Sequence, residues 1–512
     1  MRRSIIQDGS VAGGGDEPRL ATGSAGLDSV LNGGFPANRL YLVEGDPGTG
    51  KTTLGLQFLL EGARRGEPVL YVTLSETKEE LTAVARSHGW SLEGVGLHEL
   101  VPPAESLKAE SQYTIFHPSE VELGETTRAV IEEVERIQPR RVVFDSLSEM
   151  RLLARDPLRY RRQILALKQF FVGRKSTVLL LDDRTSADAD LQVQSIAHGV
   201  VVLEQLELDY GAERRRLRVS KLRGSRFRGG FHDFTIKTGG VEVYPRLVAA
   251  DRRNEFTPES VASGVAELDA LLGGGLDRGT ATLVLGPAGC GKSSVAAHFA
   301  AAAAARGEQA ASFIFDEGVN TYLGRAAGLG TDLRAHVEAG RLKVQQVDPA
   351  EMSPGQFAHA VCTAVEGGAR LVIIDSLNGY LQAMPDERFL TAQMHELLTF
   401  LNQQGVVTLL VMAQHGFMGS MSSPVDVSYL ADTVVLLRYF EAAGAIRRAI
   451  SVVKKRTGRH EDTIRELRLS ASRGVEVGAP LTAFRGVLTG VPVFTGDGVR
   501  ESSLFGGGDD EH

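Results

Sequence analysis

The sequence has 512 residues, of which 43% are hydrophobic and 23% charged, as in a globular protein of two or three domains. Its formal net charge of −8 provides no general attraction to nucleic acid or to an anionic membrane. The two cysteines cannot form a disulfide framework, so we expect a cytoplasmic protein. The alanine-rich residues 296–305 are too few to span a bilayer and predict a packed helix instead.

After residues 1–17, which we expect to be a disordered leader, residues 45–52 match the phosphate-binding pattern G-x-x-x-x-G-K-[ST]. An apolar strand at 40–43 precedes this loop, and a helix is predicted after it. Lys51 is then expected to reach the β- and γ-phosphates of ATP, and the Thr52 hydroxyl to bind Mg²⁺. The residues expected to bind this nucleotide are Gly45, Asp46, Pro47, Gly48, Thr49, Gly50, Lys51, Thr52 and Thr53.

A second phosphate loop follows at residues 286–293, in the same strand–loop–helix setting. Lys292 lies 241 positions after Lys51, and Gly264 lies 241 positions after Gly23 in a similar preamble. This constant spacing indicates a tandem duplication. The second set of expected nucleotide ligands is Gly286, Pro287, Ala288, Gly289, Cys290, Gly291, Lys292, Ser293 and Ser294, with the Ser293 hydroxyl on Mg²⁺.

In both halves, apolar strand patterns alternate with helical patterns and are followed by strands alone. This order predicts an α/β fold, in which each half is a mostly parallel twisted sheet with helices on both faces and an antiparallel extension. Expected strands are 69–74, 141–145, 177–181, 200–208, 214–221, 234–237, 312–315, 371–375 and 406–411, with an antiparallel region at 433–477. Expected helices are 77–87, 125–137, 157–172, 354–366 and 387–401. We place the first domain at 18–247, a linker at 248–260, the second domain at 261–478 and a tail at 479–512.

Acidic residues follow strands near each loop. Asp145 and Asp375 each end an apolar strand and are each followed by Ser-Leu, which predicts Mg²⁺ sites, although an Asp in this place can also cap a turn. Glu76 in the first half, and Asp316 and Glu317 in the second, are candidate bases for the water that attacks ATP. Since neighbouring residues on a strand point to opposite faces, only one of Asp316 and Glu317 is expected to face the phosphate unless the strand has ended.

Cations repeat as well. Lys221 and Arg223 are predicted to share one strand face, as are Lys454 and Arg456. Such pairs could neutralise the γ-phosphate of a neighbouring subunit, or they could be solvated charges.

Together these motifs resemble the KaiC family, tandem ATPases of the RecA superfamily that include the cyanobacterial circadian oscillator. The resemblance covers about residues 18–477 and includes Glu76-Thr77, Lys221-Leu222-Arg223-Gly224, Asp432-Thr433 and Ile464-Arg465-Glu466. It implies two RecA-like P-loop NTPase domains in a homo-hexamer of stacked rings, with ATP at the subunit interfaces. It also implies a slow ATPase in the first domain and an autokinase in the second.

The acceptors implied by the resemblance are adjacent Ser and Thr residues before the Asp-Thr strand. Here they are Ser428 and Tyr429, so we expect phosphorylation at Ser428; alternatively, Ser428 caps a helix. The family's pair of adjacent glutamates is also altered, to Ser75-Glu76 and Asp316-Glu317. Regulatory protein partners are possible but unidentified, because the family's docking regions do not match and some KaiC-like proteins act in signalling without a clock.

Two other functions fit the same fold. One is a DNA-dependent ATPase, supported by the arginine-rich residues 214–218 and by Arg223, Arg226 and Arg228, although the net charge makes nucleic acid an unlikely partner. The other is a nucleotide-gated scaffold whose output is ring assembly.

Overall fold

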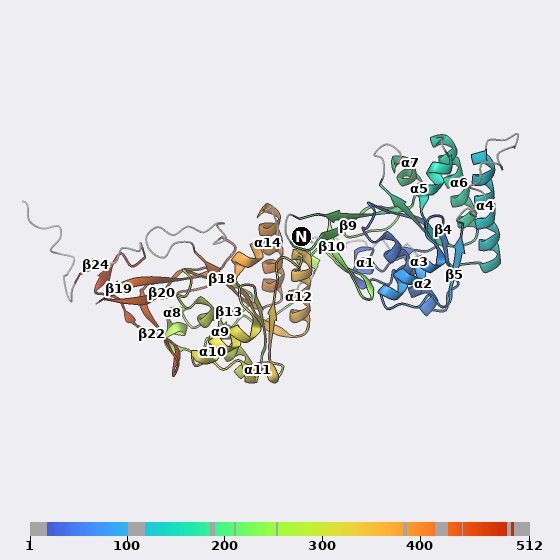
Figure 1. The fold of residues 1–512 in the computed structure, drawn as a ribbon. Helices are drawn as coiled ribbons and strands as arrows, with labels where there is room; N and C mark the ends of the chain where they lie inside the picture. Colours follow the sequence, from blue (N-terminus) through green and yellow to red (C-terminus); the bar gives the residue numbers. More distant parts are fainter. Residues whose placement is uncertain are drawn as a thin grey trace, which may run out of the picture. The chain divides into compact units, whose positions relative to one another are not determined.

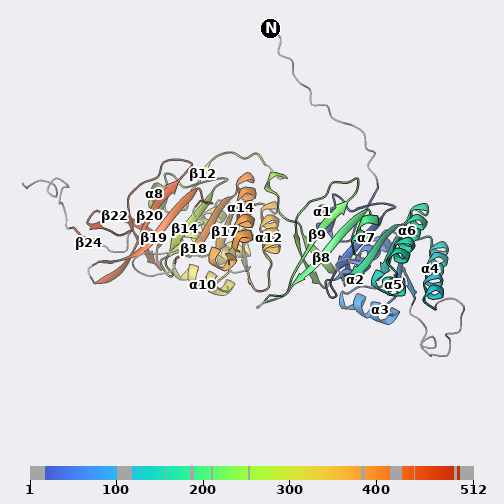
Figure 2. The same ribbon diagram turned by 90° about the horizontal axis from the view of Figure 1, so that it is seen from above.

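The computed structural model describes residues 18–100, 118–154, 156–184, 190–208, 211–251, 254–381, 387–414, 429–442, 444–488 and 493–495. The chain forms two compact units, Met1–Arg246 and Leu247–His512, which are considered separately below (Figures 1 and 2). The predicted leader at 1–17 and the end of the predicted tail lie outside the described residues. No helix in the described part of the chain has the length and apolar character needed to cross a membrane.

The first unit is built on a nine-stranded sheet with the order β11-β10-β9-β8-β3-β7-β6-β4-β5. The six strands from β8 to β5 in this order are parallel, and β9, β10 and β11 extend the sheet antiparallel. The bounds are β3 (Leu40–Gly45), β4 (Val69–Thr73), β5 (Val95–Glu99), β6 (Arg141–Asp145), β7 (Thr177–Asp183), β8 (Gly199–Leu206), β9 (Arg214–Leu222), β10 (His232–Lys237) and β11 (Gly240–Tyr244).

Helices cover both faces of this sheet. Alternation along β3 sends Tyr41 and Val43 to one face and Leu40 and Leu42 to the other, so each face has its own core. The first face packs against α1 (Ala25–Val30), α2 (Lys51–Arg64) and α3 (Lys78–Ser87). The second packs against α4 (Pro118–Ile137), α5 (Leu147–Ala154), α6 (Pro157–Gly173) and α7 (Asp190–Ile196).

The second unit repeats this plan in the order β16-β15-β17-β18-β14-β19-β20-β21-β22. Its strands are β14 (Ala281–Gly286), β15 (Gln309–Ile314), β16 (Leu342–Gln346), β17 (Ala369–Asp375), β18 (Val407–Ala413), β19 (Thr433–Ala442), β20 (Ala445–Lys455), β21 (Arg465–Ser470) and β22 (Gly474–Pro480). Its helices are α8 (Ala266–Leu271), α9 (Lys292–Ala305), α10 (Val319–Gly328), α11 (Arg334–Glu338), α12 (Pro354–Glu366), α13 (Leu377–Leu381) and α14 (Glu387–Gln403). The α/β fold with parallel sheets and antiparallel extensions is thus confirmed.

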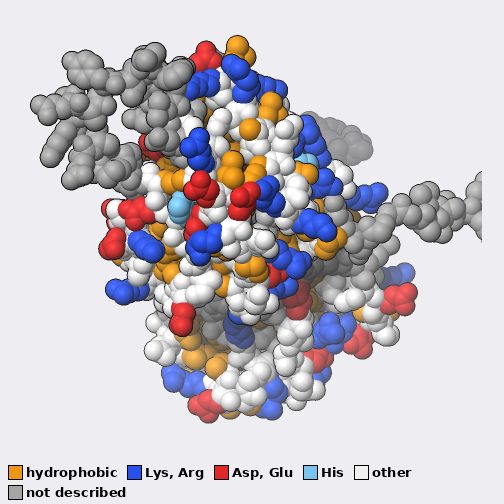
Figure 3. All heavy atoms as spheres, turned by 90° about the vertical axis from the view of Figure 1, so that its right-hand side faces the viewer, with side chains coloured by type: hydrophobic (Ala, Val, Ile, Leu, Met, Phe, Trp, Pro, Cys, Tyr) orange, Lys and Arg blue, Asp and Glu red, His pale blue; other side chains and the backbone are white. Residues whose placement is uncertain are grey.

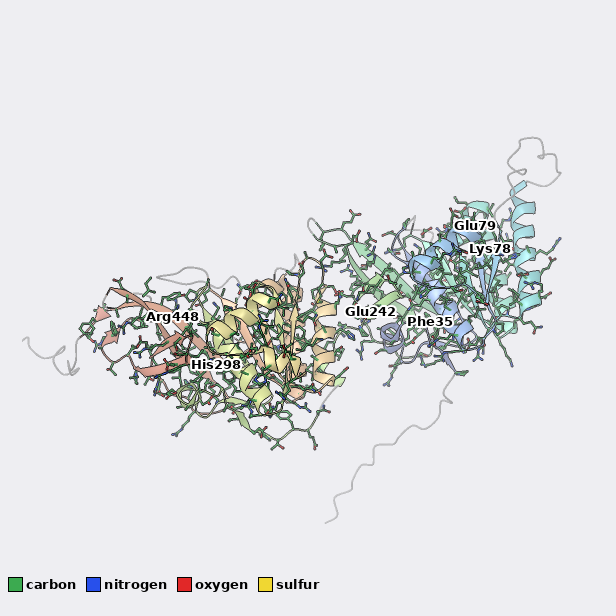
Figure 4. The ribbon with its side chains drawn as sticks, turned by 60° about the horizontal axis from the view of Figure 1, so that its bottom comes forward. Phe35, Lys78, Glu79, Glu242, His298 and Arg448 are labelled. Atoms are coloured by element: carbon green, nitrogen blue, oxygen red, sulfur yellow. The ribbon has the colours of Figure 1, made fainter. Side chains whose placement is uncertain are left out.

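Three small two-stranded antiparallel sheets complete the described strands: β1 (Arg19–Leu20) with β2 (Phe35–Pro36), β12 (Ser260–Val261) with β13 (Leu276–Asp277), and β23 (Phe484–Arg485) with β24 (Val493–Phe494). Phe35, labelled in Figure 4, stacks with Tyr41 at a ring distance of 4.4 Å and so ties β2 to the core. In the segment predicted as a linker, η3 (Ala249–Asp251) packs on the second unit, where Ala249 is buried and its N–H donates to Glu396.

Trp90 follows α3 and packs against the β10–β11 hairpin, where a Cβ on Gly240 would come within 2.5 Å of the indole. The indole also lies 4.9 Å from the ring of His88, measured between ring centres. The Nε2 atom of His88 is 3.4 Å from the Thr53 hydroxyl on α2, so these contacts connect Trp90 to the helix that follows the first phosphate loop.

Candidate functional site

The first phosphate loop connects the end of β3 to the start of α2, as its sequence predicts. Gly50 is the residue before the helix and has a φ of 95°, in the left-handed region that side chains disfavour. A Cβ on Gly50 would also lie 2.5 Å from Ile236 Cδ1 of β10. No side chain caps the helix, so the N–H groups of its first turn remain available to an anion.

Lys51 is buried, with 7% of its surface exposed, and its ammonium group points back into the loop. Its Nζ donates to the carbonyl oxygens of Gly45 (2.8 Å) and Asp46 (3.0 Å) and forms an ion pair of 2.8 Å with Asp183. Our sequence analysis did not single out Asp183. The strand register explains its position, because Gly45 and Asp183 are directly paired where the neighbouring parallel strands β3 and β7 end.

Asp145 lies beside the loop at the end of β6. Its Oδ2 accepts hydrogen bonds from the Thr52 hydroxyl (2.9 Å) and from the Tyr71 hydroxyl (2.5 Å). Burial raises the pKa of Asp145, while the hydrogen bonds from Tyr71 and Thr52 and the charge of Lys51 act in the opposite direction. A buried carboxylate bonded to the loop hydroxyl is the arrangement expected of a Mg²⁺ ligand pair.

Glu76 is half-buried, three residues beyond the end of β4, and its Oε2 is buried without a hydrogen-bond partner among the described residues. Burial, followed by the charges of Asp145 and Glu80, raises its pKa to about 7. A carboxylate with a pKa near the working pH is suited to accept a proton.

The second loop has the same backbone, with Gly291 at a φ of 105° before α9. Lys292 is again buried and donates to the Pro287 carbonyl oxygen at 2.7 Å, and burial lowers its pKa. The residue paired with Gly286 on β18 is Ala413, so the carboxylate that Asp183 provides in the first unit has no counterpart at this position. Farther along α9, His298, labelled in Figure 4, bonds to Thr331 and to the N–H of Val475.

Asp375 ends β17 as Asp145 ends β6. It is buried, burial raises its pKa, and a hydrogen bond from Ser293 opposes that rise. Its Oδ2 has no hydrogen-bond partner among the described residues. An unpaired buried carboxylate oxygen next to the loop hydroxyl fits a cation site.

Asp316 and Glu317 lie beyond the end of β15 and contact different groups. Asp316 is exposed and its Oδ2 accepts a hydrogen bond of 2.5 Å from the Ser376 hydroxyl. Glu317 forms an ion pair of 2.5 Å with Arg325 of α10, which our sequence analysis also missed. Because the strand has already ended, the alternation rule does not decide which of the two faces the loop.

The repeated cations occupy matching places in the two extensions. Lys221 and Arg223 both donate to the Ser195 carbonyl oxygen in the last turn of α7, at 3.2 and 2.9 Å. In the second unit, Lys454 donates to the Ala431 carbonyl oxygen (2.8 Å) and Arg456 to that of Tyr429 (3.1 Å). Both pairs therefore hold the backbone just before β8 and β19. Ser428 lies outside the described residues.

Two RecA-like α/β units, each with a phosphate loop and a strand-end aspartate beside it, define a tandem P-loop NTPase. The profile of the KaiC ATPase family matches residues 20–248 and 261–482. The chain belongs to the KaiC family, and it is therefore a nucleotide-binding ATPase with tandem domains.

Named relatives match over nearly the full length. The chain is 27% identical over 503 residues to the circadian clock protein KaiC3 of Synechocystis sp., covering 95% of this chain and 97% of the relative. It is 28% identical over 492 residues to the circadian clock oscillator protein KaiC of Synechococcus elongatus, covering 93% and 92%.

Proposed function

We propose that the protein binds ATP with Mg²⁺ at both loops and hydrolyses it at one or both. The observation that carries this proposal is the repeated contact between a loop hydroxyl and a strand-end carboxylate, Thr52 with Asp145 and Ser293 with Asp375. The described residues contain no group of three or more metal-binding side chains. That suits Mg²⁺, which in phosphate loops takes one or two protein ligands and completes its shell with phosphate oxygens and water.

The remaining groups supply the chemistry. Lys51 and Lys292 would leave their carbonyl partners to bind the β- and γ-phosphates, and bound Mg²⁺ would neutralise developing phosphate charge. Glu76 in the first unit, and Asp316 or Glu317 in the second, would orient the attacking water and accept its proton.

We further propose a homo-hexamer with ATP at subunit interfaces, in which Lys221, Arg223, Lys454 and Arg456 act on the neighbour's nucleotide. Lys221 and Arg223 donate to the same carbonyl oxygen, and Lys454 and Arg456 donate to carbonyl oxygens of one short segment, which supports a shared role. The second unit would phosphorylate Ser428 of the protein itself. We place this activity in the cytoplasm, in signalling or timing; the names of the relatives, which are circadian clock proteins, support timing.

The test separates hydrolysis from self-phosphorylation. The full chain is incubated with γ-labelled ATP and Mg²⁺ beside three variants, Lys51→Ala, Lys292→Ala and Ser428→Ala. We expect free phosphate from the wild type, less from each lysine variant, and label on the protein that Ser428→Ala and Lys292→Ala both lose. Label that persists in Ser428→Ala would contradict this acceptor, and Tyr429→Phe would then locate it. Native mass spectrometry with and without ATP tests the hexamer.

A DNA-dependent ATPase has less support from the arginine-rich strand β9. Arg214 is buried, Arg216 forms an ion pair of 2.8 Å with Glu204, and the guanidinium groups of Arg216 and Arg218 lie over the Phe231 ring. Figure 3 shows one face of the molecule, on which basic and acidic side chains are interspersed. Stimulation of phosphate release by DNA, weakening steeply with salt, would favour this alternative.

If the protein is instead a nucleotide-gated scaffold, the Glu76→Gln, Glu317→Gln double variant should still assemble into rings.

A further inference from the structure

The helix that follows the candidate base carries a different residue at one equivalent position in the two halves of the chain. Helices α3 and α10 are equivalent: both start two residues after the glutamate, both have ten residues, and Leu81 and Tyr322 occupy the same buried place. Position 84 on α3 is Val84, which packs on the core, whereas the equivalent position on α10 is Arg325. The duplication has thus placed a cation beside Glu317 that Glu76 lacks.

Arg325 holds Glu317 with both ends of its guanidinium. The Nη2 atom donates to Oε1 at 2.5 Å and the Nε atom to Oε2 at 3.5 Å. The pair is sheltered, with 32% of the Arg325 side chain and 23% of the Glu317 side chain exposed. The guanidinium also lies 5.4 Å from the centre of the Tyr322 ring, a buried residue, which fixes the direction of the arginine.

The equivalent carboxylate in the first unit has no such restraint. One oxygen of Glu76 is buried and unpaired within the part of the chain that the structure describes. Two other carboxylates, Asp145 and Glu80, are the charges that act on it. Glu76 is thus an unrestrained acceptor for a proton, while a proton transferred to Glu317 has to compete with the guanidinium that holds both of its oxygens.

We infer that Arg325 is a positioning residue that restrains Glu317 and slows ATP hydrolysis at the second loop relative to the first. This inference rests on the proposed function, in which Glu317 serves as a base. The consequence is a longer-lived ATP at the second loop, because water is activated less often there. Asp316, the other acidic residue after β15, is left outside this ion pair and bonds to Ser376.

The experiment uses the full chain with Lys51→Ala, so that phosphate release reports the second loop. In this background we compare Arg325→Val, which copies Val84, with Arg325→Lys, Glu317→Gln and the double variant Arg325→Val, Glu317→Gln. The kcat and KM for ATP are measured for each. We expect Arg325→Val to raise kcat by about 3- to 10-fold with KM changed less than about 2-fold, as for a freed base. Arg325→Lys should stay near the parent rate, and the double variant should fall to the rate of Glu317→Gln.

The reciprocal change is the matched control. Val84→Arg in a chain silenced with Lys292→Ala should lower the kcat of the first loop by about 3- to 10-fold. If Glu317→Gln lowers kcat but Arg325→Val leaves it unchanged or lowers it as well, Arg325 does not restrain the base. Arg325 would then be either neutral or a cation that aids catalysis. If Glu317→Gln kept the parent rate, the assignment of Glu317 as a base would fail, and the inference with it. Unchanged hydrogen exchange across α10 would show that the helix remains folded in each variant.

Discussion

At the scale of single residues, the two nucleotide sites use the same motif but surround it with different charges. Lys51 is paired with Asp183, whereas the ammonium group of Lys292 donates to a backbone carbonyl oxygen and forms no ion pair with the described residues. Glu76 is half-buried and is influenced by the charges of other carboxylates, whereas Glu317 is paired with Arg325. Each difference exchanges a charged side chain for an apolar one, so each predicts a measurable difference between the sites.

The raised pKa of Glu76 makes the stability of the first unit depend on pH. A carboxylate normally has a pKa of 4.5, and in the folded state that of Glu76 is about 7. Because the folded state favours the protonated form of Glu76, the contribution of this group to the free energy of unfolding is fully present below pH 4.5. It is lost as the pH rises through 7. We expect Glu76→Gln to raise the free energy of unfolding by about 1–2 kcal/mol at pH 8, after allowance for partial exposure, and by much less at pH 5.

Urea denaturation of the nucleotide-free chain, followed by hydrogen exchange in peptides of the first unit, measures this effect. Glu79→Gln is a suitable control, because Glu79 is exposed on the same helix start and is labelled in Figure 4. If Glu76→Gln raised the free energy of unfolding equally at pH 5 and pH 8, the raised pKa of Glu76 could not be the cause.

Asp183 predicts a difference in nucleotide affinity. Its carboxylate competes with the phosphates for Lys51, so nucleotide binding has to break an ion pair of 2.8 Å. We expect Asp183→Ala, which copies Ala413, to tighten ADP binding at the first loop by about 3- to 10-fold, the equivalent of about 1 kcal/mol. Titration calorimetry measures the ADP affinity of the first loop in chains that carry Lys292→Ala to disable the second loop. The reverse change, Ala413→Asp in a Lys51→Ala chain, should weaken binding, and weaker binding in Asp183→Ala would instead make Asp183 a ligand.

At the scale of elements, the phosphate loop depends on close packing between β10 and the start of α2. Gly50 has a positive φ and its Cα faces Ile236. Gly66, after the same helix, has a φ of 73° but open space around its Cα. We expect Gly66→Ala to cost about 1 kcal/mol through the backbone alone, and Gly50→Ala to abolish measurable ADP binding at the first loop because the loop has to move as well. Equal ADP affinity in the two variants, measured by calorimetry, would contradict the role of Ile236.

Much of this element structure could be predicted from sequence. Continuous apolar runs identified the buried parallel strands, and the glycine pattern identified both loops, because each signal is local. The edge strands β5 and β16 were missed because half-buried edge strands carry a weak apolar pattern. The edge strand β11 was also missed: it is mostly buried, but it has only five residues, one of them glutamate. Asp183 was missed because its position beside Lys51 depends on the register of two strands that are far apart in the chain. Arg325 was missed because its pairing with Glu317, eight residues away, depends on how the first turns of α10 direct its side chain.

At the scale of the whole molecule, each unit has its own hydrophobic cores on the two faces of its sheet. A substitution that destabilises one unit is therefore expected to leave the stability of the other unit unchanged. Arg141 offers a test, since it is fully buried between β6, α2 and the start of the first unit. Its Nε pairs with Glu67 at 2.5 Å, and its Nη1 donates to the carbonyl oxygens of Ala21 and Phe58.

We expect Arg141→Met to destabilise the first unit by about 3–5 kcal/mol, because Glu67 loses its buried partner. Arg140→Ala is the matched control: Arg140 is 51% exposed, lies 3.6 Å from the same Glu67, and should cost less than about 1 kcal/mol. Hydrogen exchange read peptide by peptide should show faster exchange in the first unit alone. Equal acceleration in the second unit would show that the two units unfold as one.

The contacts of Trp90 give the molecule a built-in optical reporter. It is the single tryptophan of the sequence, and its ring lies beside that of His88, which in turn contacts Thr53, the residue after Thr52 of the first phosphate loop. Movement of the first loop is expected to change the surroundings of the indole and hence its emission, while the second unit contains no tryptophan. Tryptophan emission of the unlabelled protein, excited selectively over tyrosine, should therefore report events at the first nucleotide site and not at the second.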